Sequence, residues 1–291
     1  MFRRAYDVAS EFTVPVVVSQ RFHDGTVTCV VGTAVVLNDD GWLLTAAHML
    51  WPLQRYAEDR PELELFDQEA VRIAGGPGSD SGKLKRLNQL AAGRTLVRNC
   101  SYWFGVDGWS VPTWETLPEA DLAAGKIDGF SPEQAAGYPT FQRDGMSPGA
   151  SVCRLGFPFH TVDATYDEAT DRFELAANTV PIPRFPNEGI LTRFHHDDAA
   201  TRVPFDVTFV ETSSPGLRGQ SGGPIFDVDG HVWGIQVRTQ HIPLGFDPEV
   251  EVGGRKVVEH QFMNVGLGAS SQTVLAFLEH IGVSVATTSG A

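Results

Sequence analysis

The chain has 291 residues, of which 42% are hydrophobic and 20% are charged, as in an ordinary globular protein with a substantial core. Its formal net charge of −14 argues against nucleic acid as a partner, because phosphates attract a basic surface. No apolar run approaches the roughly 20 residues of a membrane-spanning helix, so we expect no membrane partner either. The length fits one or two domains.

The cysteines do not indicate a metal site. The chain has three of them, Cys29, Cys100 and Cys153, and their spacing fits no metal-binding motif. We therefore expect no metal and no cofactor. Near the N-terminus, the apolar run at residues 14–18 is too short for the core of a signal peptide. Together these features predict a soluble protein of the cytoplasm.

The first part of the chain reads as short strands joined by turns. Residues 1–11 predict a short helix or arm, and residues 13–21 a strand. Residues 27–37 are rich in valine, which β-structure favours, and predict the next strand. The stretch Asn38-Asp39-Asp40-Gly41 is a hairpin signal, and residues 42–45 predict the returning strand.

Two stretches in this half carry side chains of interest. Thr45-Ala46-Ala47-His48 places a histidine directly after an apolar strand and two small residues, where its ring could reach the edge of a cleft. A lone histidine is nevertheless more often structural. At residues 121–127, Asp121 opens a short apolar segment and Lys126 follows five places later. Taken alone, this is an ordinary strand start.

The second half begins less regularly. Residues 148–158 predict a turn and a strand, whereas residues 161–204 show no clear periodicity. Within them, His195-His196-Asp197-Asp198 could be taken for a metal site. Adjacent histidines point to opposite faces of an extended chain, and no third ligand is near in sequence, so we expect a solvated turn.

The end of the chain predicts more strands and one helix. Strands are expected over residues 205–211 and 262–267, with a hairpin over residues 226–235. Residues 272–280 predict a helix with an apolar face, capped at its N-terminus by Ser271.

The most informative stretch is Gly219-Gln220-Ser221-Gly222-Gly223-Pro224, a serine within a run of glycines. Glycine tolerates backbone angles that other residues avoid, so it gathers where the chain turns sharply or approaches a ligand closely. Such a turn could project the serine hydroxyl into a cleft beside free backbone N–H groups, which would stabilise a developing oxyanion. The alternative is a glycine-rich surface turn.

Taken together, the three stretches around His48, Asp121 and Ser221 resemble the histidine, aspartate and serine motifs of the trypsin-like (chymotrypsin-fold) serine proteases, in the same chain order. The resemblance covers roughly residues 12–282, and it implies an all-β fold of two six-stranded antiparallel Greek-key β-barrels with a C-terminal α-helix. Residues 1–291 then form one peptidase domain. Its parts are an N-terminal barrel (about 12–128), a C-terminal barrel (about 145–268) and a helix (270–282), with residues 129–149, which are rich in Pro and Gly, as the connection.

The resemblance also implies roles for individual residues. Ser221 would be the nucleophile, His48 the general base, and Asp121 the group that orients the histidine. The N–H groups of Gly219 and Ser221 would form the oxyanion hole. The substrate would be a protein or peptide.

The chain departs from the family pattern at two positions beside these motifs. Secreted relatives usually have a cysteine after the histidine, where this chain has Met49, so the resemblance implies that their disulfide framework is absent here, as suits a reducing compartment. The residue before the serine is Gln220, so an activating ion pair with a newly cut N-terminus cannot form there. We expect control by loop ordering instead, through an activating partner, the substrate or a processing event.

The substrate pocket is the part of the expected site that the sequence defines least. Pro215 stands where relatives selective for Lys or Arg carry an aspartate, and Thr239 falls near a wall that glycine often forms. Arg238 is expected close to the cleft. The acidic residues Asp247, Glu249 and Glu251 could supply charge to the pocket from elsewhere, or they could form a solvated loop.

The spacing between His48 and Asp121 exceeds that of a minimal family member, and residues 51–102 hold the insertion. Residues 75–83 predict a loop by composition. They do not form a phosphate-binding loop, because Pro77 stands where glycine is required and Leu84 where Ser or Thr should follow the lysine. The basic stretch Lys83-Leu84-Lys85-Arg86 is either part of this solvated loop or a cleavage site for processing.

Three functions remain open from the sequence. The leading hypothesis is a serine endopeptidase of restricted specificity. A non-catalytic binding module that kept the protease fold is the second, and the third is an esterase or acyl transferase that uses the same three residues.

Overall fold

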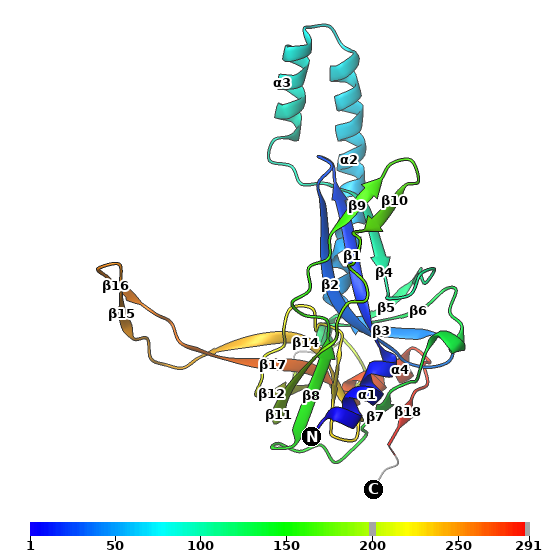
Figure 1. Cartoon of the computed structure of the whole chain (residues 1–291), viewed down its shortest axis with the longest axis vertical. Coiled ribbons are helices and arrows are strands. Elements are labelled where there is room, and N and C mark those ends of the chain that lie inside the picture. Colours follow the sequence, from blue (N-terminus) through cyan, green and yellow to red (C-terminus); the bar gives the residue numbers. More distant parts are fainter. Residues whose placement is uncertain (198–201, 289–291) are drawn as a thin grey trace.

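The computed structural model describes residues 1–197 and 202–288, and most of their regular structure is β (Figure 1). Two large sheets form the body of the molecule, and three projections leave it. Among the helices in the described residues, we find none with the length and apolar character needed to cross a membrane.

The first sheet has six antiparallel strands in the order β4-β1-β2-β3-β6-β5. The order 4-1-2-3 is that of a Greek key. Valine-rich stretches build its centre, where β1 and β2 pair from Thr13 with Val35 to Arg21 with Val27. The strands predicted over residues 13–21, 27–37 and 42–45 are therefore confirmed. The strands are β1 (Thr13–Phe22), β2 (Val27–Val36), β3 (Trp42–Ala46), β4 (Val97–Trp103), β5 (Trp114–Leu117) and β6 (Leu122–Lys126).

The second sheet contains a closed ring of six antiparallel strands in the order β13-β8-β11-β12-β17-β14, which closes through the pairing of β13 with β14. Numbered within the ring, this order repeats that of the first sheet. The short strands β7 and β18 extend the sheet beside β14 in parallel. The ring consists of β8 (Ser151–Gly156), β11 (Phe185–His196), β12 (Thr208–Thr212), β13 (Pro224–Phe226), β14 (Val232–Pro243) and β17 (Phe262–Ser270), with β7 (Thr140–Phe141) and β18 (Ala286–Thr287) outside it.

These two sheets confirm the predicted fold class, an all-β arrangement of two six-stranded Greek-key barrels with a C-terminal helix. One detail differs within the described residues: β4 and β5 do not pair, so the first barrel is not closed by hydrogen bonds as the second is. Residues 161–204 are also more regular than expected, because the 12-residue strand β11 lies within them.

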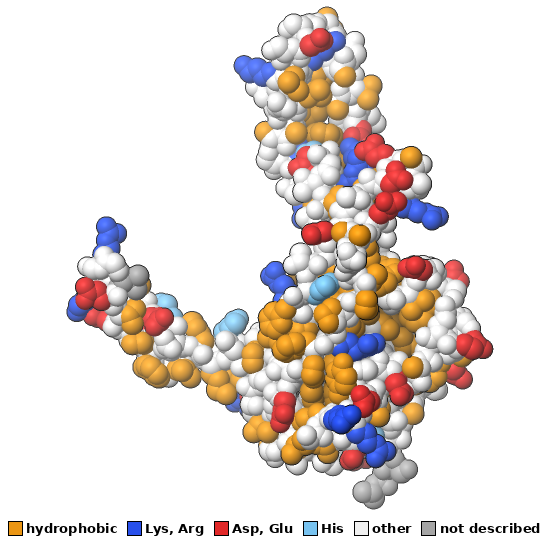
Figure 2. Space-filling model, viewed as in Figure 1, with side chains coloured by type: hydrophobic (Ala, Val, Ile, Leu, Met, Phe, Trp, Pro, Cys, Tyr) orange, Lys and Arg blue, Asp and Glu red, His pale blue; other side chains and the backbone are white. Residues whose placement is uncertain are grey.

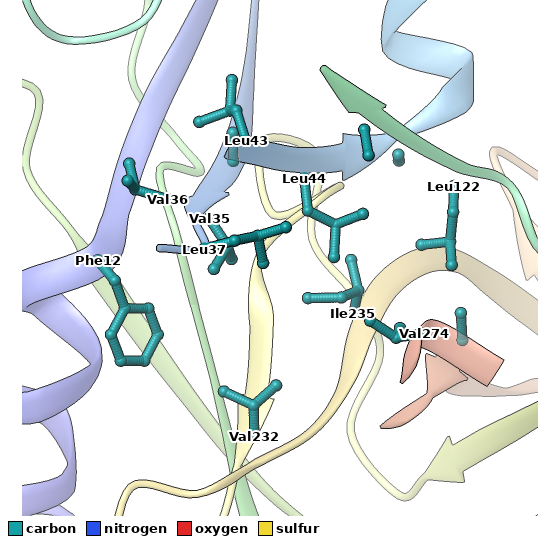
Figure 3. Packing of buried hydrophobic residues seen from close by; sticks show 14 of the residues in the cluster. Phe12, Val35, Val36, Leu37, Leu43, Leu44, Leu122, Val232, Ile235 and Val274 are labelled. Atoms are coloured by element: carbon teal, nitrogen blue, oxygen red, sulfur yellow. The ribbon is translucent and has the colours of Figure 1, made fainter. Parts of the chain in front are cut away.

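One hydrophobic cluster joins the two sheets (Figure 3). Leu43 and Leu44 of β3 and Ile235 of β14 are fully buried in it. Each such side chain stabilises the fold by about 1.5–3 kcal/mol. Because the same cluster holds residues of both sheets, it fixes how the two sheets face each other.

Two helices cover this cluster. α1 (Arg3–Phe12) confirms the predicted N-terminal helix and buries Phe12. α4 (Ser271–His280) confirms the predicted C-terminal helix and buries Val274. The predicted cap was wrong by one residue, because Ser270, not Ser271, accepts the N–H of Thr273 at 3.2 Å. Both helices have one face on the cluster and the other toward solvent, as their apolar periodicity predicts.

Most of the insertion is a helical hairpin, and the loop predicted over residues 75–83 is shorter than expected (Figure 1). α2 (Trp51–Gly75) and α3 (Asp80–Ala91) flank a turn at residues 76–79, and the Ser79 hydroxyl caps α3 by accepting the Gly82 N–H at 3.2 Å. The glycines and the proline mark only this turn. The flanking residues are rich in Leu, Ala, Glu, Gln and Arg, which favour helix. The basic stretch 83–86 therefore lies on a helix, none of whose residues is buried.

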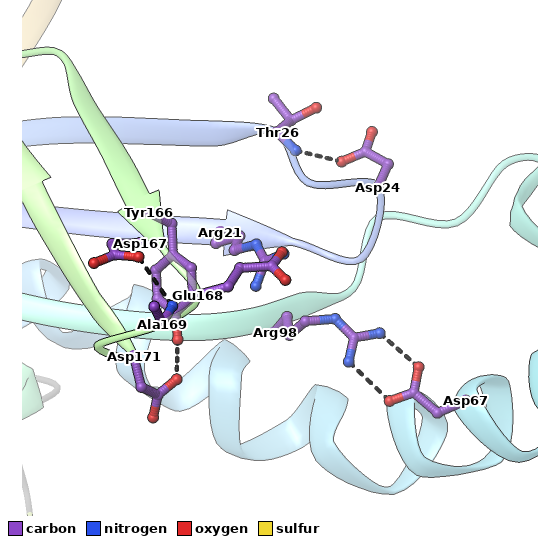
Figure 4. Close-up of polar contacts among 10 residues, drawn as sticks. All are labelled: Arg21, Asp24, Thr26, Asp67, Arg98, Tyr166, Asp167, Glu168, Ala169 and Asp171. Carbon is purple, nitrogen blue, oxygen red and sulfur yellow. Dashed lines mark hydrogen bonds and ion pairs between the residues drawn. The ribbon is translucent and has the colours of Figure 1, made fainter.

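Polar contacts tie two projections to the first sheet (Figure 4). Arg98 of β4 donates two hydrogen bonds to Asp67 of α2, one of them 2.8 Å long, and this holds the pKa of the Asp67 carboxyl below its ordinary value. Arg21 of β1 pairs with Glu168 and lies 4.5 Å from the centre of the Tyr166 ring. Those two residues belong to the hairpin of β9 (Ala164–Asp167) and β10 (Arg172–Leu175).

The third projection is an arm built from the ends of β14 and β17, with β15 (Glu249–Val252) and β16 (Arg255–Val258) at its tip (Figure 1). Figure 2 shows apolar side chains along it, and Phe246 and Phe262 are among those exposed. The acidic residues expected in a loop lie on this arm, where Asp247 pairs with His260 at 3.2 Å and Glu249 with Lys256 at 3.1 Å.

Candidate active site

His48 and Asp121 meet at the first sheet, where β3 ends and β6 begins. β3 leads into a short 3₁₀ helix, η1 (Ala47–Leu50), that carries His48, and β6 is preceded by another, η2 (Pro118–Ala120), that ends at Asp121. One carboxylate oxygen of Asp121 lies 2.7 Å from Nδ1 of His48, and the other accepts the backbone N–H of His48 at 2.8 Å. Both carboxylate oxygens therefore hold the histidine, one by its ring and one by its backbone.

The backbone of Asp121 adopts an unusual conformation. Its φ of 54° and ψ of 44° lie in the left-handed region, which costs most residues about 1–2 kcal/mol and which aspartate tolerates better than most. The carbonyl oxygen of Asp121 also accepts the N–H of Ala47 at 2.9 Å. Three hydrogen bonds thus join Asp121 to residues 47–48, and they keep the strained geometry in place.

The serine loop, residues 217–223, comes from the second sheet but is fastened to the first. Thr33 of β2 donates its N–H to the carbonyl of Ser221 at 2.9 Å and its hydroxyl to the carbonyl of Gly219 at 2.7 Å. A Cβ on Gly222 would lie 3.0 Å from the backbone N of Ala46, two residues before His48. The loop therefore reaches the end of β3, next to the histidine.

The glycines of the loop leave two backbone donors available. Gly219 has a φ of +99°, and its carbonyl is held by Thr33 and by the N–H of Phe157 at 3.1 Å. Over the chain that the structure describes, the N–H groups of Gly219 and Ser221 donate to no protein atom. A substrate carbonyl oxygen that approached Ser221 would find both donors free.

Gln220 points away from the cavity and closes the loop from behind. It is fully buried, its side-chain oxygen accepts the N–H of Leu217 at 3.0 Å, and its amide donates to the carbonyl of Phe185 at 3.4 Å. The backbone N–H of Gln220 also bonds to the Leu217 carbonyl at 2.9 Å. The neutral amide of Gln220 thus pairs with the hydrogen-bonding groups inside the turn, and it needs no charged partner.

His48 and Ser221 line one cavity of about 1100 Å³ between the two sheets. Its walls come from β1, β2 and the start of α2 on one side, and from the loop after β8, the serine loop and β14 on the other. Trp51, whose ring centre lies 5.6 Å from that of His48, also lines it. The insertion therefore contributes to the cavity through its first turns, a role that the sequence analysis did not assign to residues 51–102.

The three residues expected at the substrate pocket separate into two groups. Arg238 and Thr239 line the cavity, and the Thr239 hydroxyl donates to the carbonyl of Gly216 at 2.6 Å. Pro215 is not among the lining residues. Its carbonyl is turned toward Asn187, at 2.8 Å from the side-chain amide, and toward the buried Arg154.

Arg154 was not singled out from the sequence. It is 1% exposed, and its guanidinium donates to the hydroxyl and the carbonyl of Ser214 at 2.9 and 2.6 Å. Burial lowers its pKa to about 10. Its hydrogen bonds hold residues 214–215, the segment that leads into the serine loop, and a polar residue in the middle of the apolar strand β8 was the only signal of this role.

Two other expectations about polar residues need revision. His195 and His196 do not form a solvated turn: they end β11, and Nε2 of His195 lies 2.8 Å from the carboxylate of Glu211, a buried acid of β12. Asp198 lies outside the described residues. The acidic residues Asp247, Glu249 and Glu251 do not line the cavity, so their predicted alternative role as pocket charges has no support.

A further cluster of Asp227, Asp229 and His231 brings three metal-ligating types together. Asp227 uses one carboxylate oxygen for the N–H groups of Asp229 and His231 and the other for the Trp233 indole, at 2.9–3.0 Å. These bonds explain the cluster as a hairpin turn between β13 and β14.

Comparisons with known proteins place the chain in a family. A family model described as a trypsin-like peptidase domain matches residues 32–235. Among curated proteins, none matches the chain significantly.

Solved structures similar to the chain include an HtrA-type protease, AlgW, with a tripeptide, and the active form of the Rv3671c protease from M. tuberculosis. The first is 16% identical with a TM-score of 0.48, and the alignment covers 97% of this chain and 63% of AlgW. The second is 14% identical with a TM-score of 0.49, and the coverage is 99% and 88%. The chain thus spans less than two thirds of the length of AlgW.

Proposed function

We propose that this chain, which belongs to the trypsin-like peptidase family, is a serine endopeptidase that hydrolyses peptide bonds in protein substrates. The observation that carries the proposal is the 2.7 Å contact between His48 and Asp121 at a cavity that Ser221 also lines. A hydroxyl, an imidazole and a carboxylate at one cleft are the groups that acyl transfer by a serine nucleophile requires.

In the proposed mechanism, Ser221 attacks the carbonyl carbon of the substrate while His48 accepts the hydroxyl proton at Nε2. This tautomer requires the proton of the neutral ring on Nδ1, and the Asp121 carboxylate favours it by accepting the Nδ1–H bond. Asp121 then stabilises the imidazolium. His48 returns the proton to the leaving amine, and an acyl-enzyme remains on Ser221, which water hydrolyses in a second passage through the same steps.

The free N–H groups of Gly219 and Ser221 would stabilise the tetrahedral oxyanion in both steps. Each such donor contributes on the order of 100- to 1,000-fold in rate. Their value depends on a fixed direction, because a donor that must first reorganise stabilises the transition state less. The bonds from Thr33 and Phe157 to the Gly219 carbonyl supply that rigidity here.

Control of the activity depends on the same loop. Gln220 is buried and bonded on both sides of its amide, so we expect no activation by an ion pair with a newly cut N-terminus. Ordering of loops by a partner or substrate remains the proposed form of control. Full peptidase activity of the freshly expressed, uncut chain without any partner would count against it.

The experiment that tests the function compares wild type with Ser221→Ala, using a fluorophosphonate probe and a panel of peptide and ester substrates. We expect Ser221→Ala to abolish labelling and to lower turnover by about a million-fold. Asp121→Asn should lower turnover by about 10,000-fold, because an amide does not hold the required tautomer. Ser101→Ala, at an exposed position on β4, is the matched control and should change neither readout.

The outcomes separate the three functions. Absence of probe labelling in a folded wild-type protein would favour a non-catalytic binding module. Labelling with turnover of esters but not of peptides would favour an esterase or acyl transferase. Peptide turnover that survives in Ser221→Ala would remove Ser221 from the mechanism.

A further inference from the structure

The cavity differs in charge from the rest of the chain. Acidic residues outnumber Lys and Arg by 36 to 22 in the sequence, yet no Asp or Glu is among the residues that line the cavity. Three arginines and two histidines do line it: Arg55, Arg218, Arg238, His48 and His160. A concave site lined by charges of one sign concentrates ligands of the opposite sign.

Two of these arginines are free to bind a ligand. Arg55 is engaged with Asp59 at 3.5 Å and with the carbonyl of Thr95. Arg218 and Arg238 are both exposed, and within the described part of the chain neither forms an ion pair with a carboxylate. Two arginines without a counter-charge therefore line the cavity.

Both arginines belong to segments that line the cavity together with Ser221. Arg218 lies inside the turn that the Gln220 N–H closes on the Leu217 carbonyl, and the next residue is Gly219. Arg238 follows an irregularity in β14, where Gln236 and Arg238 pair with the consecutive residues Gly268 and Leu267 of β17. Such a bulge redirects the side chain that comes after it.

Arg238 is also held by its neighbours. Its guanidinium carbon lies 4.9 Å from the centre of the Phe209 ring, and its carbonyl accepts the amide of Gln236 at 2.8 Å. Stacking on an aromatic ring leaves the edge of a guanidinium available for a carboxylate.

The part of the cavity near Gly216 is narrowed by a neighbouring side chain and carries no carboxylate. The bond from Thr239 to the Gly216 carbonyl bridges the segment before the serine loop and β14. Behind that bridge, Gln236 is 2% exposed, and its amide nitrogen lies 2.1 Å from where a Cβ on Gly216 would be. A side chain already fills the region behind Gly216, and no carboxylate among the residues that line the cavity could receive a lysine or an arginine.

We infer that the cavity selects peptides with an aspartate or glutamate next to the scissile bond, whose carboxylate binds between Arg218 and Arg238. The inference rests on the proposed peptidase function and specifies its substrate class. Arginine presents a planar fork of donors that matches a carboxylate, and the two N–H···O bonds are stronger than those between neutral groups.

The test begins with the sites that the wild-type enzyme cuts in a peptide library, read by mass spectrometry. A matched pair of peptides then carries glutamate or glutamine at the preferred position. We expect kcat/KM to be about 10- to 100-fold higher for glutamate, the range for a hydrogen bond to a charged group at a partly solvated site. The preference should weaken as salt is added.

Arg218→Gln and Arg238→Gln should each reduce the preference for glutamate by about tenfold, and the double variant should remove it. The matched control is Arg255→Gln on β16, an exposed arginine of the arm that is not among the residues that line the cavity, which should leave the preference unchanged. A preference for basic or apolar residues, or a glutamate preference that persists in the double variant, would overturn the inference.

A binding measurement separates failure of this inference from failure of the proposed function. In Ser221→Ala, fluorescence anisotropy of the labelled glutamate and glutamine peptides reports recognition without turnover. Equal affinities, with cleavage and probe labelling intact in wild type, would refute acidic selectivity and leave the peptidase in place. Loss of labelling in wild type would refute the peptidase, and the affinity ratio would still decide whether the cavity recognises carboxylates.

Discussion

Gly222, directly after the proposed nucleophile, gives the sharpest prediction about the serine loop. It has a φ of +85°, in the left-handed region, and a Cβ there would lie 2.1 Å from the carbonyl oxygen of Thr33 and 2.3 Å from the hydroxyl of Thr45. The first of these is a backbone atom in the centre of β2, which cannot move aside cheaply. Gly222→Ala must therefore push the serine loop away from β2.

Gly25 provides a matched control. It sits in the turn between β1 and β2 with a φ of +86°, and a Cβ there would meet nothing within 4 Å. Gly25→Ala should therefore cost only the strain of the left-handed backbone, about 1–2 kcal/mol in the free energy of unfolding. Gly222→Ala carries the same strain plus about 1–3 kcal/mol for the forced displacement.

The assay is urea unfolding of both variants with peptidase activity measured on the folded protein. We expect Gly222→Ala to lose about 2–5 kcal/mol and at least 100-fold in turnover, since a displacement of about 1 Å of a reacting group has that effect. Gly25→Ala should retain full activity. Equal destabilisation by the two substitutions, or full activity of Gly222→Ala, would refute the packing argument.

Two further predictions concern hydrogen bonds. Burial acts to raise the pKa of Glu211, but bonds from Arg193, Thr192 and His195 outweigh it and leave the pKa below its ordinary value. Glu211→Gln should therefore lower the free energy of unfolding by about 1.5–3 kcal/mol at neutral pH. The difference in this free energy between variant and wild type should shrink as the pH falls below about 4.5, because protonation then removes the same bonds in wild type. A difference that stays constant between pH 7 and pH 3 in chemical unfolding would contradict this. Thr33→Val removes the hydroxyl that holds the Gly219 carbonyl, so it should lower the free energy of unfolding by about 1 kcal/mol. It should also lower kcat more than it raises KM. An unchanged kcat would show that the Phe157 N–H alone keeps the loop in place.

The repeated topology of the two sheets shows one limit of sequence reasoning. The first sheet and the six-stranded ring of the second, each numbered from its own first strand, have the order 4-1-2-3-6-5, yet no internal repeat is evident in the sequence. The reason is that strand order depends on backbone pairing and on a buried face, and many apolar residues meet those requirements equally well. Strand positions and the β13–β14 hairpin could be predicted, because alternation and turn residues are local signals, but the pairing of β13 with β8, which is distant in the chain, could not.

The candidate site, too, could be predicted from the sequence only in part. The three motifs identified His48, Asp121 and Ser221, because the backbone each needs is encoded nearby: a strand end, a strand start and a run of glycines. The helical hairpin at residues 51–91 was missed, since the glycines of its turn gave a stronger local signal than the helical composition on either side.

The sequence by itself determined the fold class and the chemical types at the cleft, because short stretches of chain encode both. Arg238 was expected close to the cleft, but only the tertiary structure decided that Pro215 turns away from the cavity, that Arg218 lines it, and that neither arginine has a counter-charge. The charge of a cavity is a property of side chains brought together from distant segments. A chain with a net charge of −14 can therefore enclose a basic cleft that its composition does not predict.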